Sequence, residues 1–257
     1  MALELPRTLT PSKVAAFTNC ALAFRFSQIE HRPEPPSPPA VKGTLVHAAL
    51  EGLFWHHPPG ARTRHAADAE LDRAWGELQS DEEFAQLQLP PDEAAGFLAD
   101  AGALVDNYFS LEDPNDVRTV AVELGVETVV DGMRLRGKID RLDVNDDGSL
   151  VVVDYKTGRA PSERYERSSL VGVQTYALLC ESALGRPPAE VRLLHLREPV
   201  AISTAATAQT IRGQRRRTVA VWSAIERACD TEDFRPQVGP LCNYCAFKSA
   251  CPAFAAA

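Results

Sequence analysis

Two aspartates and a lysine near the middle of the chain have the residue types and spacing of a metal-dependent catalytic centre. Asp140 is followed 14 residues later by Asp154, which opens the sequence D-Y-K-T-G. Successive side chains of a strand point to opposite faces, so Asp154 and Lys156 share one face and Tyr155 lies on the other. Two carboxylates that converge bind a hard divalent cation, usually Mg2+.

Such a cation activates water as a nucleophile and offsets the charge that builds on a phosphate under attack. The neighbouring Lys156 can hold the attacking water or stabilise the developing oxyanion, and its point charge suits phosphate. The alternative is a surface hairpin with an ordinary Asp/Lys pair, because charged residues are common at strand ends and short motifs often match by chance. The elements around the motif therefore decide between the two interpretations.

Residues 117–158 contain Val-rich segments with the alternation of strands, separated by turn sequences at 131–132 and 146–148. This pattern predicts three antiparallel strands joined by tight turns. If the strand of Asp140 pairs with the strand that ends at Asp154, the two carboxylates come together. Beyond them we expect a helix, a short strand and a long helix, at about residues 170–184, 191–196 and 205–229.

The N-terminal part of the chain is predicted to be helical. A first helix covers residues 11–30 and contains Cys20, and a Pro-rich break follows at 32–39. A second helix at 41–56 has His47 on or near its apolar face, and residues 61–109 predict two more helices.

We therefore expect one α/β domain over residues 1–257, with a mixed β-sheet flanked by helices. Its parts are a helical insertion, a catalytic sheet core and a C-terminal cysteine segment, at about residues 58–115, 116–200 and 238–257.

Composition supports a globular protein without a membrane segment. Hydrophobic residues make up 45% and charged residues 24% of the 257 positions, and no apolar run approaches the roughly 20 residues of a membrane span. The N-terminus lacks the basic and apolar regions of a secretory signal, so we expect a cytoplasmic location. The net charge of −8 hides an asymmetry, since residues 156–217 carry 11 Lys and Arg against 5 Asp and Glu. That basic segment directly follows the candidate site, where phosphate contacts would be useful.

The combination of D-x-K-x-G at a strand end, a second Asp one strand earlier and a basic helix afterwards resembles the RecB-like branch of the PD-(D/E)XK nucleases. The resemblance implies a restriction-endonuclease-like fold. That branch also has a histidine in a G-x-x-x-H setting on an upstream helix, which Gly43 to His47 match. By this resemblance His47, Asp140 and Asp154 hold the metal, with a further oxygen from the Tyr155 carbonyl. Without the family, a lone histidine on an Ala/Leu helix is more often a core or surface residue.

Three other positions are compared with the same family. Glu123 resembles an acidic position near the metal and joins the expected catalytic set, although Glu127 lies on the same strand face. Gln174 and Tyr176 fall where many relatives have Gln and Tyr four residues apart. Here they are two apart, and residues two apart do not share a helix face. We therefore expect one of the two to approach DNA, and not both.

The cysteines form a triplet near the C-terminus and a distant singleton. The four candidates for ligands are Cys20, Cys242, Cys245 and Cys251. Four thiolates suit either tetrahedral zinc or an iron-sulfur cluster. One cysteine before the nuclease core and three after it resemble the iron-sulfur variant of RecB-like nucleases, found in AddB-type and CRISPR-associated proteins. The resemblance implies a structural 4Fe-4S cluster, with zinc as the alternative, while Cys180 and Cys229 are expected to be ordinary buried residues.

These features together predict a Mg2+- or Mn2+-dependent deoxyribonuclease. The resemblance further implies an exonuclease of DNA repair or recombination that acts on DNA with a free end or a single strand. Several arginines are candidates for sequence-independent phosphate contacts, with a solvated helix face as the alternative. They are Arg159, Arg164, Arg167, Arg212, Arg215, Arg216 and Arg217.

Two other classes of function stay open. The first is a nuclease-like DNA-binding subunit that cleaves only with a helicase partner; the chain has no G-x-x-x-x-G-K-[ST] phosphate loop, so unwinding needs another protein. The second is an iron-sulfur or zinc protein with only a fold-level likeness to nucleases.

Overall fold

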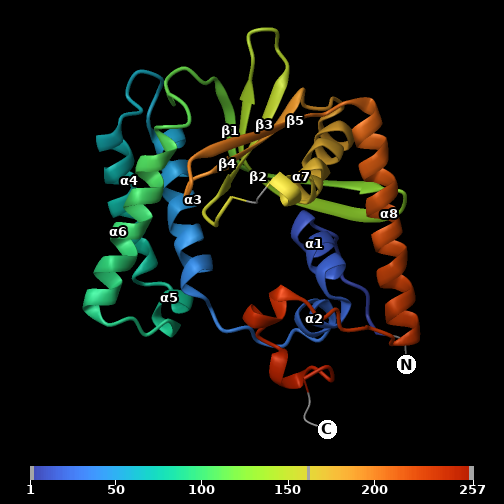
Figure 1. Ribbon diagram of the computed structural model, residues 1–257. Coiled ribbons are helices and arrows are strands. Elements are labelled where there is room, and N and C mark those ends of the chain that lie inside the picture. The colour runs from blue at the N-terminus through green and yellow to red at the C-terminus, as the bar shows by residue number, and fades with distance from the viewer. Residues whose placement is uncertain (1–2, 161–162, 255–257) are drawn as a thin grey trace.

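A five-stranded mixed sheet forms the centre of the computed structural model (Figure 1). The structure describes the backbone of residues 3–160 and 163–254 and the side chains of the same ranges except 163–173. The strands lie in chain order, and all neighbours are antiparallel except β3 and β4, which are parallel. They are β1 (Thr119–Val130), β2 (Met133–Val144), β3 (Leu150–Lys156), β4 (Glu190–His195) and β5 (Val200–Ala205).

Helices cover both faces of the sheet (Figure 1). One face packs on two N-terminal helices, α1 (Pro11–Asn19) and α2 (Ala21–Phe24), and on two later ones, α7 (Glu163–Leu184) and α8 (Ala208–Thr231). The other face packs on the helices α3 (Pro38–His56), α4 (Arg64–Leu78) and α6 (Pro91–Tyr108), with the short α5 (Glu82–Gln86) beside them. A π-helical turn, Arg25–Ile29, follows α2, and two 3-10 turns, Pro240–Tyr244 and Lys248–Ala250, lie near the C-terminus.

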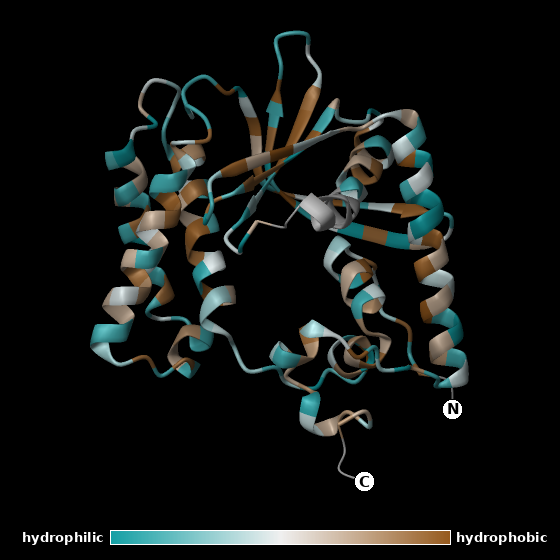
Figure 2. Cartoon of the chain, viewed as in Figure 1, coloured by the Kyte–Doolittle hydropathy of each residue, from teal (hydrophilic) through white to brown (hydrophobic). Residues whose placement is uncertain are grey.

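The central strand β3 shows why both faces are covered. Val152 packs into the apolar cluster beneath α7 and α8, whereas Val151 and Val153 pack into the cluster beneath α3 and α6. Apolar residues on both faces make β3 brown along most of its length in Figure 2. The parallel pairing of β3 with β4 requires a crossover, which α7 provides. Consequently β3 ends beside the loop that leads into α7.

Most of the expected architecture is confirmed. The structure has the mixed sheet flanked by helices, the three antiparallel strands, the helix over 170–184 and the strand at 190–195. No helix in the described ranges combines the length and apolar character needed to cross a bilayer.

Four details of the predicted elements differ from the structure. Strand β5 was not expected, because it is an edge strand whose residues are largely exposed and carry little apolar signal; the last helix starts only at Ala208, where the Thr207 side chain caps it. Residues 61–109 hold three helices rather than two. The first helix is interrupted at Cys20, whose extended backbone (φ −163°, ψ 108°) separates α1 from α2.

A buried arginine, Arg141, joins β2, β3 and the end of α6. Arg141 is fully buried and donates hydrogen bonds to the hydroxyls of Tyr155 (3.0 Å) and Tyr108 (3.1 Å). It also forms ion pairs with Asp143 (2.9 Å) and Glu112 (2.5 Å). Two carboxylates and two phenols thus surround one guanidinium, which fixes the register of β2 against β3.

We predict that Arg141→Met lowers the free energy of unfolding by about 3–5 kcal/mol, because removing one partner leaves buried carboxylates without their cation. Urea denaturation followed by circular dichroism measures the change. Arg118→Met is the matched control, since the Arg118 side chain is 65% exposed and its pairing with Asp146 contributes little. Equal stability of the two variants would contradict the assignment.

Candidate active site

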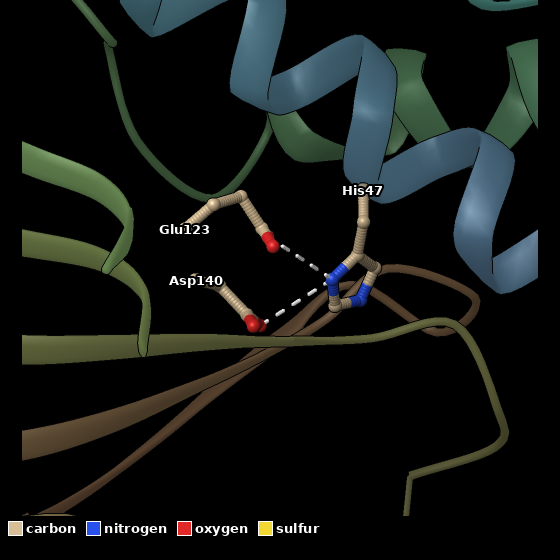
Figure 3. A group of neighbouring side chains, drawn as sticks. All are labelled: His47, Glu123 and Asp140. Atoms are coloured by element: carbon tan, nitrogen blue, oxygen red, sulfur yellow. Dashed lines mark ion pairs between the residues drawn. The ribbon is translucent and has the colours of Figure 1, made fainter. Parts of the chain in front are cut away.

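His47, Glu123 and Asp140 converge from one helix and two strands (Figure 3). His47 Nδ1 lies 3.6 Å from Asp140 Oδ2 and 4.0 Å from Glu123 Oε1. One donor atom from each residue lies within 4.8 Å of the others, close enough for one cation to contact all three. His47 Nε2 is 3.2 Å from the carbonyl oxygen of Tyr155, which brings the histidine to the end of β3.

Gly43 allows α3 to approach the sheet at this point. A Cβ atom at Gly43 would lie 3.2 Å from Thr157 Oγ1, closer than most such contacts. One helical turn later His47 reaches the Tyr155 carbonyl. The spacing G-x-x-x-H therefore has a geometric reason. The glycine allows α3 to lie close to the end of β3, and the histidine one turn later can then reach the Tyr155 carbonyl.

The two strand carboxylates lie where β1 and β2 lose their regular alternation. Residues three apart on a regular strand face opposite sides, yet Ile139 and Leu142 of β2 both pack into the cluster beneath α7 and α8. On β1, opposite Asp140, the backbone of Glu123 is left-handed (φ +48°). A non-glycine residue in this conformation costs energy and is often found at functional sites. This break in the alternation of β1 and β2 lies at Glu123 and Asp140, the two strand carboxylates of the candidate site.

Negative charge is concentrated around Asp140. Its Oδ2 accepts a hydrogen bond from the Tyr155 backbone amide at 2.9 Å. Burial, followed by the charge of Asp154, nevertheless raises the pKa of Asp140 to about 6, with Glu123 adding to the effect. A bound cation would relieve this repulsion, and the donor set of carboxylates, imidazole and a nearby carbonyl fits a divalent metal ion.

Asp154 and Lys156 lie on β3 and share one face, as the alternation predicts. Lys156 Nζ is 2.5 Å from Asp154 Oδ2, and the Asp154 side chain is almost fully buried whereas that of Lys156 is 44% exposed. Asp154 is not one of the three residues whose donor atoms lie within 4.8 Å of one another. Its charge still raises the pKa of Asp140, which places it beside that group.

The contacts of Glu123 and Glu127 show which of these two acidic residues of β1 lies at the candidate site. Glu127 accepts hydrogen bonds from the exposed Arg134, at 3.0 Å from Nε, and is engaged there. Glu123 instead faces His47 and pairs with Lys138. The structure therefore places Glu123, and not Glu127, at the candidate site.

Glu51 is a site residue that the sequence analysis did not single out. It lies one helical turn after His47 on α3 and lines the same open cleft, of about 460 Å3, with Glu123 and Lys138. Burial and the charge of Glu123 raise the pKa of Glu51. The signal was available, because residues four apart on a helix share a face.

Tyr176 approaches the carboxylates from α7. Burial, followed by the charges of Asp154 and Asp140, raises the pKa of Tyr176. Its ring would lie 3.1 Å from a Cβ atom at Gly137, so the missing side chain on β2 admits it. Gln174 is half-exposed on the same helix.

The arginines of α8 do not gather at the carboxylates. Gln214 of α8 donates to Thr175 of α7, which defines the inner face of α8. Arg212 and Arg216 are exposed on the opposite side of the helix, at 100° per residue. Arg215 donates two hydrogen bonds to Asp131 in the turn between β1 and β2, at 2.6 and 2.8 Å.

Arg159 is exposed three residues after Lys156, and Arg217 is exposed on α8. The side chains of Arg164 and Arg167 lie outside the described residues.

The chain ends meet around the candidate cysteine ligands. One apolar cavity is lined by Cys20, Cys242, Cys245 and Cys251. The backbone amide of Gln237 donates to Cys20 Sγ, and that of Gly239 to Cys242 Sγ, each at 3.4 Å. The other two cysteines, Cys180 and Cys229, are buried in α7 and α8 as expected.

A family model of the PD-(D/E)XK nuclease superfamily matches residues 8–252, nearly the whole chain. The chain belongs to the PD-(D/E)XK nuclease superfamily. Membership in this superfamily identifies the protein as a nuclease, and the acidic group with His47 is the expected kind of metal site.

Two phage proteins are similar in sequence to this PD-(D/E)XK nuclease. The Gene 69 protein of Mycobacterium phage L5 is 27% identical over 52% of this chain and 45% of its own length. The Gene 69 protein of Mycobacterium phage D29 is 22% identical over 95% of this chain and 96% of its own length. The chain thus spans about half of the first relative and nearly all of the second.

Two solved structures have a distant likeness to the nuclease. SSO0001 is 12% identical with a TM-score of 0.45, over 99% of this chain and 90% of that one. A candidate exonuclease from Eubacterium rectale is 11% identical with a TM-score of 0.47, over 93% of this chain and 87% of that one.

We predict that Glu123→Gln weakens Mn2+ binding by about 10- to 100-fold, because it removes one charged oxygen from the group around His47. Isothermal titration calorimetry measures the affinity. Glu127→Gln is the control on the same strand and should leave the affinity unchanged, since Glu127 is engaged with Arg134. Equal effects of the two substitutions would remove Glu123 from the metal site.

Proposed function

We propose that the protein is a Mg2+- or Mn2+-dependent deoxyribonuclease of the RecB-like branch, an exonuclease that hydrolyses DNA in repair or recombination. The observation that carries the proposal is the convergence of His47, Glu123 and Asp140 beside the Asp154–Lys156 pair. Two of these groups come from D-x-K at the end of β3, and the histidine comes from the G-x-x-x-H turn of α3. The cytoplasm is the proposed location.

The residues divide the work by their chemistry. His47, Glu123, Asp140 and Asp154, with the Tyr155 carbonyl, would hold the cation, which supplies an activated water and offsets charge on the phosphate. The Lys156 side chain is half-exposed and paired with Asp154, and its ammonium would orient the water or stabilise the developing oxyanion. Tyr176 lies beside Asp154 and Asp140, and the exposed Arg159 follows Lys156 by three residues. Both would contact the DNA strand.

A second candidate is a DNA-binding subunit that cleaves only with a helicase partner. Arg212 and Arg216 are exposed on the outer side of α8, away from the carboxylates. A basic surface in that position would bind the DNA backbone rather than take part in cleavage, which favours the second candidate. Gln174, half-exposed on α7, is the alternative to Tyr176 as the residue of that helix that would contact DNA.

We also propose that the four cysteines around the terminal cavity hold a 4Fe-4S cluster. A tetrahedral zinc site with Zn–S bonds of 2.3 Å requires sulfurs about 3.8 Å apart. In the described part of the chain, the group at His47 is the only set of three or more potential metal ligands that all lie within 4.8 Å of one another, so no three of these sulfurs are that close together. A larger cofactor suits that spacing, and backbone amides donate to two of the sulfurs, the kind of hydrogen bond that iron-sulfur sites use.

The cluster would have a structural role. It would tie Cys20, between α1 and α2, to the segment at the C-terminus, and so close a loop of more than 200 residues. The α1–α2 segment packs on α7 and α8, beside the catalytic face of the sheet. Loss of the cluster would therefore loosen the support of the site without removing a catalytic group.

We predict that the purified protein degrades end-labelled linear DNA with Mg2+ or Mn2+ and not with EDTA, and that Asp154→Asn and Lys156→Ala each lower the rate at least about 100-fold. Denaturing gels with single- and double-stranded substrates measure the rate. Lys156→Ala should still bind DNA, which a fluorescence anisotropy titration checks. Wild-type protein that binds DNA without cutting it, until a helicase is added, would favour the second candidate instead.

We predict that anaerobically purified protein is brown, with a broad visible absorption, and contains about four iron atoms per chain, as one 4Fe-4S cluster requires. Cys20→Ser should lose the colour and the iron, whereas Cys180→Ser should keep both because Cys180 is buried in α7. Colourless protein with one zinc per chain by metal analysis would replace the cluster with the zinc alternative.

A further inference from the structure

His195, the last residue of β4, is a buried histidine with no role in the arrangement described above. Its side chain is only 4% exposed, and neither ring nitrogen has a hydrogen-bond partner among the residues that the structure describes. Buried polar groups are almost always paired, and an unpaired one costs stability. An unpaired buried group therefore calls for an explanation, and a role at a neighbouring site is one.

The register of the sheet places His195 beside the D-x-K motif. In the parallel pairing of β3 with β4, Lys156 is opposite His195 and Asp154 is opposite Leu193. Paired residues share a face, and neighbouring strands lie about 4.8 Å apart. Leu193 packs beneath α7 and α8, so His195 lies on the same face as Asp154 and Lys156.

The electrostatics of His195 agree with this position. Burial, followed by the positive charge of Lys156, lowers the pKa of His195, while Asp154 and Glu198 act in the opposite direction. The ring is therefore neutral near pH 7, and a neutral imidazole offers one acceptor nitrogen. Lys156 carries three N–H donors, of which the ion pair with Asp154 needs only one.

We infer that His195 is a positioning residue for Lys156, with its ring nitrogen as a second acceptor, beside Asp154, that holds the ammonium over the site. The inference rests on the proposed nuclease function. Asp154 is also a proposed ligand of the cation, and charge shared with a cation weakens its attraction for Lys156. His195 is the neighbouring buried acceptor, and it keeps the flexible lysine directed at the reacting phosphate.

The kinetic test compares His195→Leu, which keeps the side-chain volume and removes the acceptor, with His195→Asn, which restores an acceptor oxygen. At saturating Mn2+ we expect His195→Leu to lower kcat about 10-fold with KM within about twofold, and His195→Asn to recover part of the loss. In a Lys156→Ala background His195→Leu should cause no further loss, because the two residues act as a unit. His65→Leu, an exposed substitution on α4, should match the wild type.

A second readout does not depend on cleavage. We expect the ring 15N resonances of His195, assigned by their absence in His195→Leu, to shift when Ca2+ is added to wild-type protein without DNA, and to stay fixed in Lys156→Ala. Urea denaturation of each variant shows whether the fold is intact. Three results would each overturn the inference: His195 ring resonances that do not shift when Ca2+ is added, an unchanged kcat in His195→Leu, or additive effects of His195→Leu and Lys156→Ala. Wild-type protein that does not cleave DNA would instead overturn the proposed function, and the NMR comparison would still test the pairing.

Discussion

The repulsion among three carboxylates held close together is the constraint on which the rest of the structure depends. Glu123, Asp140 and Asp154 come from three adjacent strands, and burial, followed by the charges of the other two carboxylates, raises the pKa of Asp140 to about 6. Left to themselves such groups would separate or take up protons. The fold opposes this with Lys156 on Asp154 and with a histidine that faces the other two. The remaining excess of negative charge is what makes the site suited to a cation.

The opposite face of the same strands carries the buried hydrogen-bond and ion-pair network of Arg141. Arg141 follows Asp140 on β2, Tyr155 follows Asp154 on β3, and the two are joined by a 3.0 Å hydrogen bond. Alternation along a strand thus places the candidate site on one face and a buried cationic network on the other. Because the network fixes how β2 lies against β3, it also fixes the separation of the two aspartates. Stability and chemistry are in this way set by neighbouring residues of one strand pair.

The sequence predicted what depends on local periodicity. It placed Asp154 and Lys156 on one face, and the 2.5 Å ion pair between them agrees with that prediction. It could not predict the left-handed backbone of Glu123, because glutamate has no preference for positive φ and only the surrounding packing maintains it. The break at Cys20 was missed for a related reason: its neighbours on both sides are helix formers, and the extended backbone at Cys20 has no local sequence signal. His195 escaped notice because it follows an apolar strand and lacks any motif.

The depth of the site is set by two glycines on opposite sides of it. Gly43 lets α3 come close to Thr157, and Gly137 lets α7 bring Tyr176 towards the carboxylates. A Cβ atom at Gly137 would lie 2.7 Å from a methyl group of Leu179, a distance that real Cβ contacts do not show, so an added side chain would require the buried Leu179 or α7 to shift. The close approach of the two helices therefore sets how far the histidine and the tyrosine lie from Asp140, and the contact of His47 with the Tyr155 carbonyl adds to it for the histidine. A site assembled in this way is as sensitive to helix position as to the identity of its charged residues.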